Sequence, residues 1–250
     1  SEDESVKKLI NKFNNLSIKY VIQEGKGLVP AANLALTYSE SDIFVRVDDD
    51  VIIDQDWFLA LVNTYDSDSK IGGVTGPTVV SDAGIKSRDL TSFLDRFKKT
   101  NNLLLKFVYY LYNNVLYENR MYDVSSFLKS GVFTLGSNFS SCLNIQGIVE
   151  VNNLEACNWS SRTTLLKAIG GFDNIYIKGL GDYHEADAAL KIKNLGYKLV
   201  FNSKVSLNHN VEGGKVESSR PNSYYRIQNF IIFYFRFFKI KSIEQFFKFT

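Results

Sequence analysis

The sequence predicts an α/β protein in which helices flank a central sheet. Short apolar runs typical of strands alternate with longer helical patterns, and 250 residues with 45% hydrophobic content can form a substantial core. Such alternation indicates a sheet of the parallel type, whose ligands bind at the carboxyl ends of the strands. The high hydrophobic content together with a formal net charge of only +2 excludes a disordered tail and a generic polyanion binder, so we expect no nucleic-acid partner.

The first elements follow one another closely along the chain. Pro30 fits the first turn of a helix, because that turn needs no intrahelical amide donor. Gly and polar residues separate the apolar runs and mark the turns. The predicted order is a helix over residues 6–13, a strand over 18–22, a helix over 28–38, a strand over 43–47, a helix over 57–65 and a strand over 71–74.

Three aspartates, Asp48, Asp49 and Asp50, follow the second predicted strand. Adjacent carboxylates repel one another, so a fold that holds them at a strand end usually supplies a cation. Oxygen ligands suit Mg²⁺ or Mn²⁺, and such a cation can hold a diphosphate. A solvated acidic turn is the plain alternative. Ile52 and Ile53 exclude an EF-hand loop, whereas a haloacid-dehalogenase-like phosphatase with Asp48 as nucleophile stays open at this point.

The pattern loosens between residues 77 and 149. The apolar stretch over residues 103–117 is interrupted by Lys106, Asn113 and Asn114, so we expect an amphipathic or buried helix and no membrane span. We interpret residues 80–148, approximately, as a helical insertion on an α/β domain of residues 1–220. This insertion is expected to shape the site of a second substrate.

A second acidic group lies at the start of a later helix. Short helices are predicted over residues 163–168 and 183–194, with a strand over 197–201 after the second. Asp182, Glu185 and Asp187 crowd the first turn of the second helix. They either complement the helix dipole or include a general base that projects into a cleft. Positions two apart lie about 200° apart around a helix, so only one of Glu185 and Asp187 can face a given substrate.

These motifs, in this order, resemble the inverting GT-A glycosyltransferases of family 2. The resemblance covers most of residues 18–230 outside the insertion, and it implies a mixed GT-A sheet flanked by helices. It also implies a nucleotide-diphospho-sugar donor, a glycan or lipid-linked acceptor, and Mg²⁺ or Mn²⁺ as cofactor. A phosphatase would leave the GGFD and HEAD segments unexplained. The matching segments are EGKGLVPAANLAL, the D-x-D strand end, ACNWSSRTTLLKAIGGFD, HEADAALKIKNLGYKLVF and Asn208-His209-Asn210.

The resemblance assigns roles to individual residues. Asp50, His209 and Asp48 are the implied metal ligands, and Glu185 is the implied base, with Asp187 beside it in the catalytic group. Ala32 and Gln228 stand where family members often carry arginine, which leaves Arg220 and Arg226 as expected cationic contacts of the diphosphate. The implied donor contacts are Asn33, Asp48, Asp49, Asp50, Arg220 and Arg226, and the implied acceptor contacts are Asn158, Trp159, Asp182 and His184.

The resemblance has one gap at the N-terminal end. The strands that hold the nucleobase in family members have no expected counterpart before residue 18. A second hypothesis therefore stays open, in which the chain is a non-catalytic domain that binds a nucleotide-sugar or a glycan. Transfer of sugar to any acceptor would exclude this second hypothesis.

Residues 221–250 form a predicted aromatic and basic helix. From Arg220 onward six basic residues stand against one acid, Glu244. Such a helix either lies in a membrane interface, where it would suit a lipid-linked acceptor, or packs on the core as a final helix. With only Cys142 and Cys157 and no visible signal peptide, we expect a cytoplasmic protein, acting at the inner face of the cell membrane if the interfacial reading holds.

Overall fold

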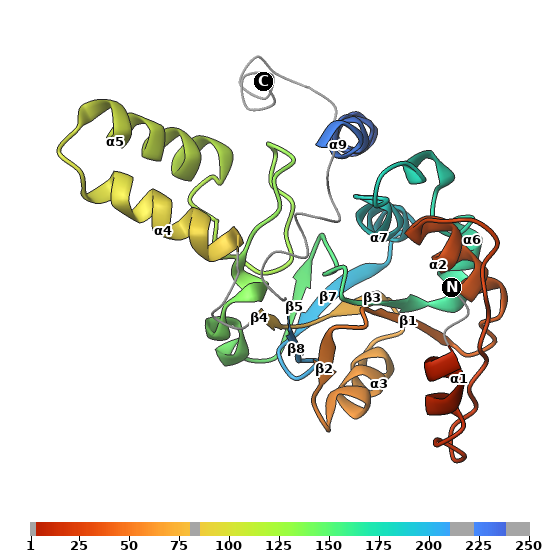
Figure 1. Cartoon of the computed structure of the whole chain (residues 1–250). Coiled ribbons are helices and arrows are strands. Elements are labelled where there is room, and N and C mark those ends of the chain that lie inside the picture. The colour runs from red at the N-terminus through yellow and green to blue at the C-terminus, as the bar shows by residue number, and fades with distance from the viewer. Residues whose placement is uncertain (1–3, 81–85, 211–222, 239–250) are drawn as a thin grey trace.

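The structure is a computed structural model that describes residues 4–80, 86–210 and 223–238 (Figure 1). It contains a five-stranded sheet and a three-stranded sheet. The first has the order β1 (Ile43–Val47), β6 (Asn158–Arg162), β3 (Ile71–Thr75), β7 (Lys198–Asn202), β5 (Ile148–Val151). The second has the order β2 (Val51–Ile53), β8 (Leu207–His209), β4 (Thr78–Val80).

The larger sheet is mixed, as the family resemblance implied. Only β3 and β7 pair in parallel, whereas β6 runs antiparallel to both β1 and β3, and β5 runs antiparallel to β7. The alternation of strands and helices had suggested a parallel-type sheet, and this is wrong for most of the pairs. The reason is that β6 enters the sheet between β1 and β3 in the opposite direction, and strand order along the chain carries no information on that direction.

Most of the predicted helices are present at the expected places. The helices are α1 (Glu4–Ile10), α2 (Leu28–Thr37), α3 (Trp57–Ser67), α4 (Lys86–Lys99), α5 (Leu103–Tyr110), α6 (Thr163–Ala168), α7 (His184–Asn194) and α9 (Ser223–Phe237). Shorter helical turns lie at Leu111–Leu116, Gly136–Asn138, Ser140–Asn144 and Asn174–Tyr176. The first of these is a π-helical turn that continues α5.

Helices cover both faces of the larger sheet (Figure 1). Along β7, Leu199 and Phe201 contribute to a large core that also contains buried residues of α2, α6, α7 and α9. Val200, between them, points to the other face and packs with Trp57 and Leu61 of α3. The period-2 alternation of a strand therefore separates two hydrophobic clusters, and the sheet is fixed between them.

The strand predicted over residues 18–22 is not formed. Within the described residues this segment has no strand assignment, and Ile18, Tyr20 and Ile22 are 41%, 39% and 53% exposed. A strand needs a hydrogen-bonding partner and one buried face, and neither is present here. The apolar composition of the segment was therefore a misleading signal.

The insertion contains a helical hairpin and its own small core. Leu94 of α4 packs with Tyr117, Met121, Leu128 and Leu135. The stretch over residues 103–117 had been expected to be amphipathic or buried, and α5 buries none of its residues. Of the two predicted alternatives, an amphipathic helix and a buried one, the amphipathic helix therefore describes α5.

The C-terminal helix α9 packs on the core through one side. Asn229, Phe233 and Tyr234 are buried, and the ring of Phe233 lies 4.9 Å from that of Phe127. Among the described residues no helix is long and apolar enough to cross a bilayer. Arg220 and the basic residues after position 238 lie outside the described residues.

Candidate active site

Three side chains that could bind a metal meet between β1 and the small sheet. β8 runs antiparallel to β2 with His209 opposite Val51, and the amide of Asn210 donates to the carbonyl of Asp50 at 2.8 Å. This pairing puts His209 Nε2 3.1 Å from Asp50 Oδ1. One ligand atom each of Asp48, Asp50 and His209 lies within 4.8 Å of the others. Residues about 160 positions apart in the sequence thus form one group.

The chemistry of this metal triad (Asp48, Asp50 and His209) fits a divalent cation. Two carboxylates and one imidazole suit Mn²⁺, and the carboxylates also suit Mg²⁺. Burial raises the pKa of Asp48, and the negative charges of Asp50 and Glu185 add to the rise, while Arg46 and His209 oppose it. A cation among these ligands would favour the charged carboxylate. Asp49 is exposed and is not part of the triad.

Glu185 lies at the first turn of α7 and is nearly buried. Its Oε1 accepts a hydrogen bond from Arg46 Nη1, and its Oε2 lies 2.9 Å from His184 Nδ1. Burial acts to raise the pKa of Glu185, but the hydrogen bond and charge of His184 and the charge of Arg46 outweigh it and lower this pKa to about 2. The side chain is thus held as a carboxylate.

The backbone before Glu185 is constrained. Tyr183, the N-cap residue of α7, has φ 75°, and Gly181 has φ 73°. The left-handed conformation is rare for a residue with a Cβ, and such outliers cluster at functional sites. The turn fixes the direction in which the first residues of α7 enter the helix, and so it positions Glu185.

Arg46 links Glu185 to the metal triad. It donates to Glu185 through Nη1, and its Nη2 lies 3.4 Å from Asp48 Oδ1. Sequence analysis missed this residue. The available signal was a charged residue inside an apolar strand, two positions before Asp48 and therefore on the same side of the chain.

A cleft of about 310 Å³ is lined by Arg46, Asp48 and Glu185, and the other two members of the metal triad lie next to Asp48 outside this lining. Its charged lining residues are Arg46, Asp48, Glu155, Asp182, Glu185 and Arg226. Arg226 of α9 lies 3.7 Å from Asp182, Nε to Oδ1, so both expected contacts are in the cleft wall. The insertion contributes Phe127 and Phe133 to the apolar part of the wall.

Glu155 is a carboxyl in the cleft that sequence analysis did not single out. Its Oε1 accepts a hydrogen bond of 2.8 Å from Ser125 Oγ of the insertion. Burial raises the pKa of Glu155, and hydrogen bonds from Ser125 and Ser137 oppose the rise. The cleft thus has one carboxyl that is strongly ionised, Glu185, and one that is shifted toward the neutral form.

Comparison with known families identifies the chain. The profile of "Glycosyl transferase family 2" matches residues 1–130, just over half of the 250 residues. The chain belongs to glycosyltransferase family 2. No curated protein sequence matches it at a significant level.

The fold of this family 2 glycosyltransferase is GT-A. A similar solved structure is the mannosyltransferase PcManGT from Pyrobaculum calidifontis in complex with GDP-Man and Mn²⁺, with a TM-score of 0.54 and 16% identity. The match covers 93% of this chain and 50% of that chain. The chain therefore spans half the length of that relative, and at this identity the likeness concerns the fold.

Two expected contact residues of the family 2 chain hold its backbone together instead. Asn33 donates to the carbonyl of Phe172 and accepts from its amide, both at 2.8 Å. Gly171 allows this approach, because a Cβ there would lie 2.7 Å from Asn33 Oδ1. Asn158 is buried, donates to the carbonyl of Val205 at 2.8 Å and accepts from Trp57 Nε1 at 3.2 Å. Asn158 satisfies buried polar groups and is closed to an acceptor. Asn33 is partly exposed, and its side-chain amide is bonded to both backbone groups of Phe172.

Trp159 and His184 lie behind Glu185. Trp159 is 0% exposed, so it is a core residue and does not stack on a sugar, and its Nε1 donates to the Glu185 carbonyl at 3.3 Å. His184 is also 0% exposed, and its Nδ1 faces both the Gly181 carbonyl at 2.6 Å and the Glu185 carboxylate. Both residues therefore position Glu185, and the expected acceptor contacts are corrected accordingly.

Asp187 points away from the cleft. Its side chain is 1% exposed and lies 2.7 Å from Lys191 Nζ, 2.5 Å from Arg236 Nη1 and 3.1 Å from Tyr176 Oη. These contacts tie α7 to α9. The placement gives Asp187 a structural role in place of the expected catalytic one, and the helical period explains why it and Glu185 face different ways.

Proposed function

We propose that this family 2 glycosyltransferase transfers a sugar from a nucleotide-diphospho-sugar to a hydroxyl of a glycan or lipid-linked acceptor, with inversion at the anomeric carbon. One observation carries the proposal: Asp48 of the metal triad and Glu185 line the same cleft, and Arg46 contacts both of these carboxylates. A cleft with separate sites for a diphosphate and for a base suits a direct displacement between two bound substrates.

The metal triad is the part of the site that acts on the donor. Asp48, Asp50 and His209 would hold Mn²⁺ or Mg²⁺, which, when bound, neutralises the charge that develops on the departing nucleoside diphosphate. The imidazole ligand favours Mn²⁺. GDP-mannose is the first donor to test, because the structurally similar PcManGT is in complex with GDP-Man and Mn²⁺.

Glu185 is the residue that acts on the acceptor. Its carboxylate takes the proton of the acceptor hydroxyl, and the hydroxyl oxygen bonds to the anomeric carbon on the face opposite the diphosphate. The bond from that carbon to the diphosphate oxygen breaks, and its electron pair leaves with the nucleoside diphosphate. A single displacement inverts the configuration, since retention requires two.

The low pKa of Glu185 sets a condition on this step. A carboxylate with a pKa of about 2 is a weak base at neutral pH, because proton transfer is most effective when the pKa is near the working pH. We expect the donor diphosphate to draw the guanidinium of Arg46 toward itself. The pKa of Glu185 then rises, and its Oε1 is freed for the acceptor.

The Arg46–Glu185 ion pair also favours a second candidate function. A chain in which Arg46 never leaves Glu185 would bind a nucleotide-sugar or glycan without turnover. The two functions differ in one result, which is the appearance of a glycosylated product with any acceptor.

The test starts with the donor. Calorimetric titration of the chain with GDP-, UDP- and dTDP-sugars is carried out with Mn²⁺ and then with EDTA. We expect one nucleotide-sugar to bind in the presence of Mn²⁺, and we expect this binding to be lost in Asp50→Ala. Transfer to an acceptor is then followed by NMR of the product's anomeric proton. A product that keeps the donor's configuration would contradict inversion, and donor binding unaffected by EDTA would contradict the metal site.

A further inference from the structure

The α4–α5 hairpin exposes large apolar side chains that do not line the cleft. Figure 1 shows the two helices projecting away from the sheets. In α5, Leu103 is 81% exposed, Leu104 68%, Phe107 56% and Tyr110 52%. Scattered exposed apolar residues need no explanation, but a contiguous group of this size marks a contact surface.

These side chains lie on one face of the helix. Leu103, Leu104, Phe107, Tyr110 and Leu111 occupy positions i, i+1, i+4, i+7 and i+8, which lie together on a 3.6-residue period. The other side of α5 faces α4, where Lys98 Nζ lies 5.9 Å from the ring of Tyr109. An amphipathic helix of a globular protein normally turns its apolar stripe toward the core. Here this α5 stripe points outward.

The hairpin also carries a concentration of positive charge. Arg96, Lys98 and Lys99 form the last turn of α4, and all three are exposed, as is Lys106 of α5. Asp95 is the exposed acid of the same turn. An apolar stripe with flanking cations matches the chemistry of an anionic lipid surface, in which headgroups attract the cations and acyl chains accept the apolar residues.

The turn at the end of the hairpin is already folded for such a contact. Asn102 caps α5, and its Oδ1 accepts from the amides of Leu104 and Leu105 at 2.9 Å and 3.3 Å. The two most exposed leucines therefore sit on an ordered first helical turn. Contact with a surface would need little further ordering of the backbone.

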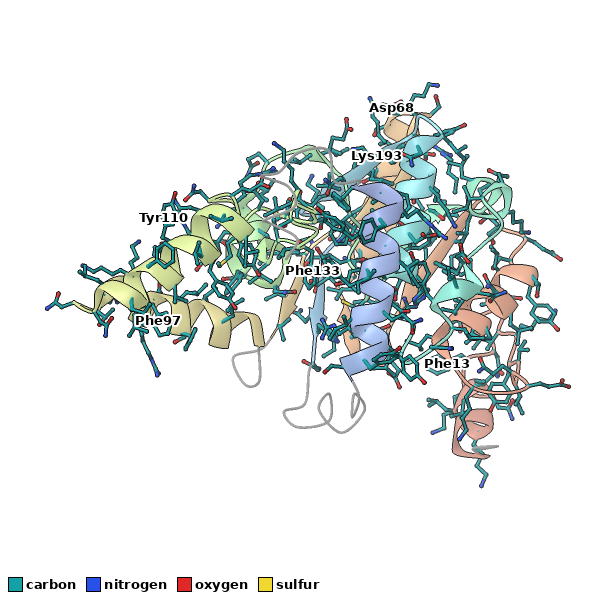
Figure 2. The ribbon with its side chains drawn as sticks, turned by 90° about the horizontal axis from the view of Figure 1, so that it is seen from above. Phe13, Asp68, Phe97, Tyr110, Phe133 and Lys193 are labelled. Atoms are coloured by element: carbon teal, nitrogen blue, oxygen red, sulfur yellow. The ribbon has the colours of Figure 1, made fainter. Side chains whose placement is uncertain are left out.

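A second apolar stripe lies on the same side of the molecule. In α9, Tyr224, Ile227, Ile231 and Phe235 are 64%, 57%, 41% and 51% exposed. Figure 1 places α5 and α9 above the sheets, with α3 below them. In the view from above, Figure 2 shows α9 and the hairpin side by side in the plane of the picture, with Phe133 labelled between them.

We propose that the face formed by the α5 stripe and the α9 stripe binds the surface of a membrane that contains anionic lipids, with the tip of the α4–α5 hairpin as its deepest contact. Two residues of the cleft lie close to these stripes: Phe133, labelled between the two helices in Figure 2, and Arg226, which belongs to α9 itself. Binding at this face does not require sugar transfer. A chain that proves inactive can still bind the membrane, and the two failures are therefore distinguishable.

The test is co-sedimentation of the chain with phosphatidylcholine vesicles, with and without phosphatidylglycerol. We expect binding to the anionic vesicles that weakens with added salt. The double variant Leu104→Glu/Phe107→Glu should bind at least about tenfold more weakly. Lys98→Glu/Lys99→Glu, which leaves the apolar stripe intact, should also lose about tenfold or more, since each cation contributes about 1 kcal/mol near an anionic surface.

Phe58→Glu is the matched control. Phe58 is 66% exposed on α3, on the opposite side of the sheet, so this variant should bind as the unmodified chain does. Thermal unfolding of each variant checks that it is folded. Equal vesicle binding by the hairpin variants and the unmodified chain would overturn the proposal. A second result would also overturn the proposal: the chain does not bind vesicles but associates with itself, and the hairpin variants abolish this self-association. A second copy of the chain would then cover this face.

Discussion

Glu185 and Asp187 stand two residues apart in the first turn of α7, and they have opposite surroundings. Glu185 faces the cleft, with Arg46 and His184 as its partners. Asp187 faces α9, where Lys191, Arg236 and Tyr176 enclose it. The partners of an acid and the side of the helix on which it lies decide whether it faces a cleft or holds two helices together. Four measurements test this difference and the site around Glu185.

The largest effect is expected for Glu185→Gln. Loss of a general base typically reduces the turnover rate by about 10²–10⁴-fold, while metal-dependent donor affinity should stay unchanged. Single-turnover transfer assays beside donor titrations measure both quantities.

Glu155→Gln is the matched control for that variant. Glu155 lines the same cleft, but burial raises its pKa, and glutamine resembles a neutral carboxyl group. We expect Glu155→Gln to retain most of the activity. Near-full transfer by Glu185→Gln together with loss in Glu155→Gln would reverse the assignment of the base.

Asp187→Asn should mainly change stability. Removal of one partner from a buried ion-pair network costs about 3 kcal/mol or more, because Arg236 and Lys191 lose a charge that they share. Urea unfolding measures this cost, and activity per folded molecule should be retained. Glu150→Gln is the control: it breaks the more exposed ion pair between Lys193 of α7 and Glu150 of β5 and should cost less than about 1 kcal/mol. Similar costs in the two variants would show that the buried network around Asp187 stabilises the protein no more than an exposed ion pair does.

Asp50→Ala and His209→Ala should weaken metal-dependent donor binding. Loss of a direct ligand should reduce affinity at least as much as loss of an outer-shell partner, for which about 10–100-fold is typical. Calorimetry at fixed Mn²⁺ measures the change, and Asp49→Ala serves as control because Asp49 is exposed and outside the triad. If Asp49→Ala weakened binding as much as Asp50→Ala, the geometry of the triad would not describe the metal site.

The smallest effect is a pH shift in Arg46→Met. The positive charge of Arg46 helps to lower the pKa of Glu185, so its removal raises that pKa. On the acid side of the pH profile, kcat/KM falls as Glu185 becomes protonated and inactive. This fall should therefore occur at higher pH in Arg46→Met. A pH profile at saturating Mn²⁺ tests the shift. An acid limb that stays in place would mean that Arg46 has no influence on the base.

Much of the secondary structure could be predicted from the sequence. The helices α2, α3, α6 and α7 and the strands β1, β3 and β7 lie within about two residues of their predicted bounds, because turn-forming residues such as Gly, Asp and Ser separate their apolar runs. The strand over residues 18–22 failed, since a strand also depends on a partner far away in the sequence. Strand direction in the sheet failed for the same reason.

The residues of the candidate site could likewise be predicted only in part. The carboxylates at the end of β1 and the acids at the start of α7 were visible as motifs. Arg46 and Glu155 were missed, because each acts through contacts that only the folded chain brings together. Asn33, Asn158 and Trp159 had been expected to contact substrates, and the structure uses them to satisfy buried backbone groups and fill the core.

The sequence by itself determined which chemical groups the protein carries and near which element ends they lie, because residue type, spacing and helical or strand period are local properties. Only the tertiary structure decided which of those groups meet: His209 reaches Asp50 through the β2–β8 pairing, Arg46 reaches Glu185 across the cleft, and Asp187 turns to α9. The physical reason is that pKa, metal affinity and ion pairing depend on distances of a few ångströms, and such distances are set by the packing of the whole chain.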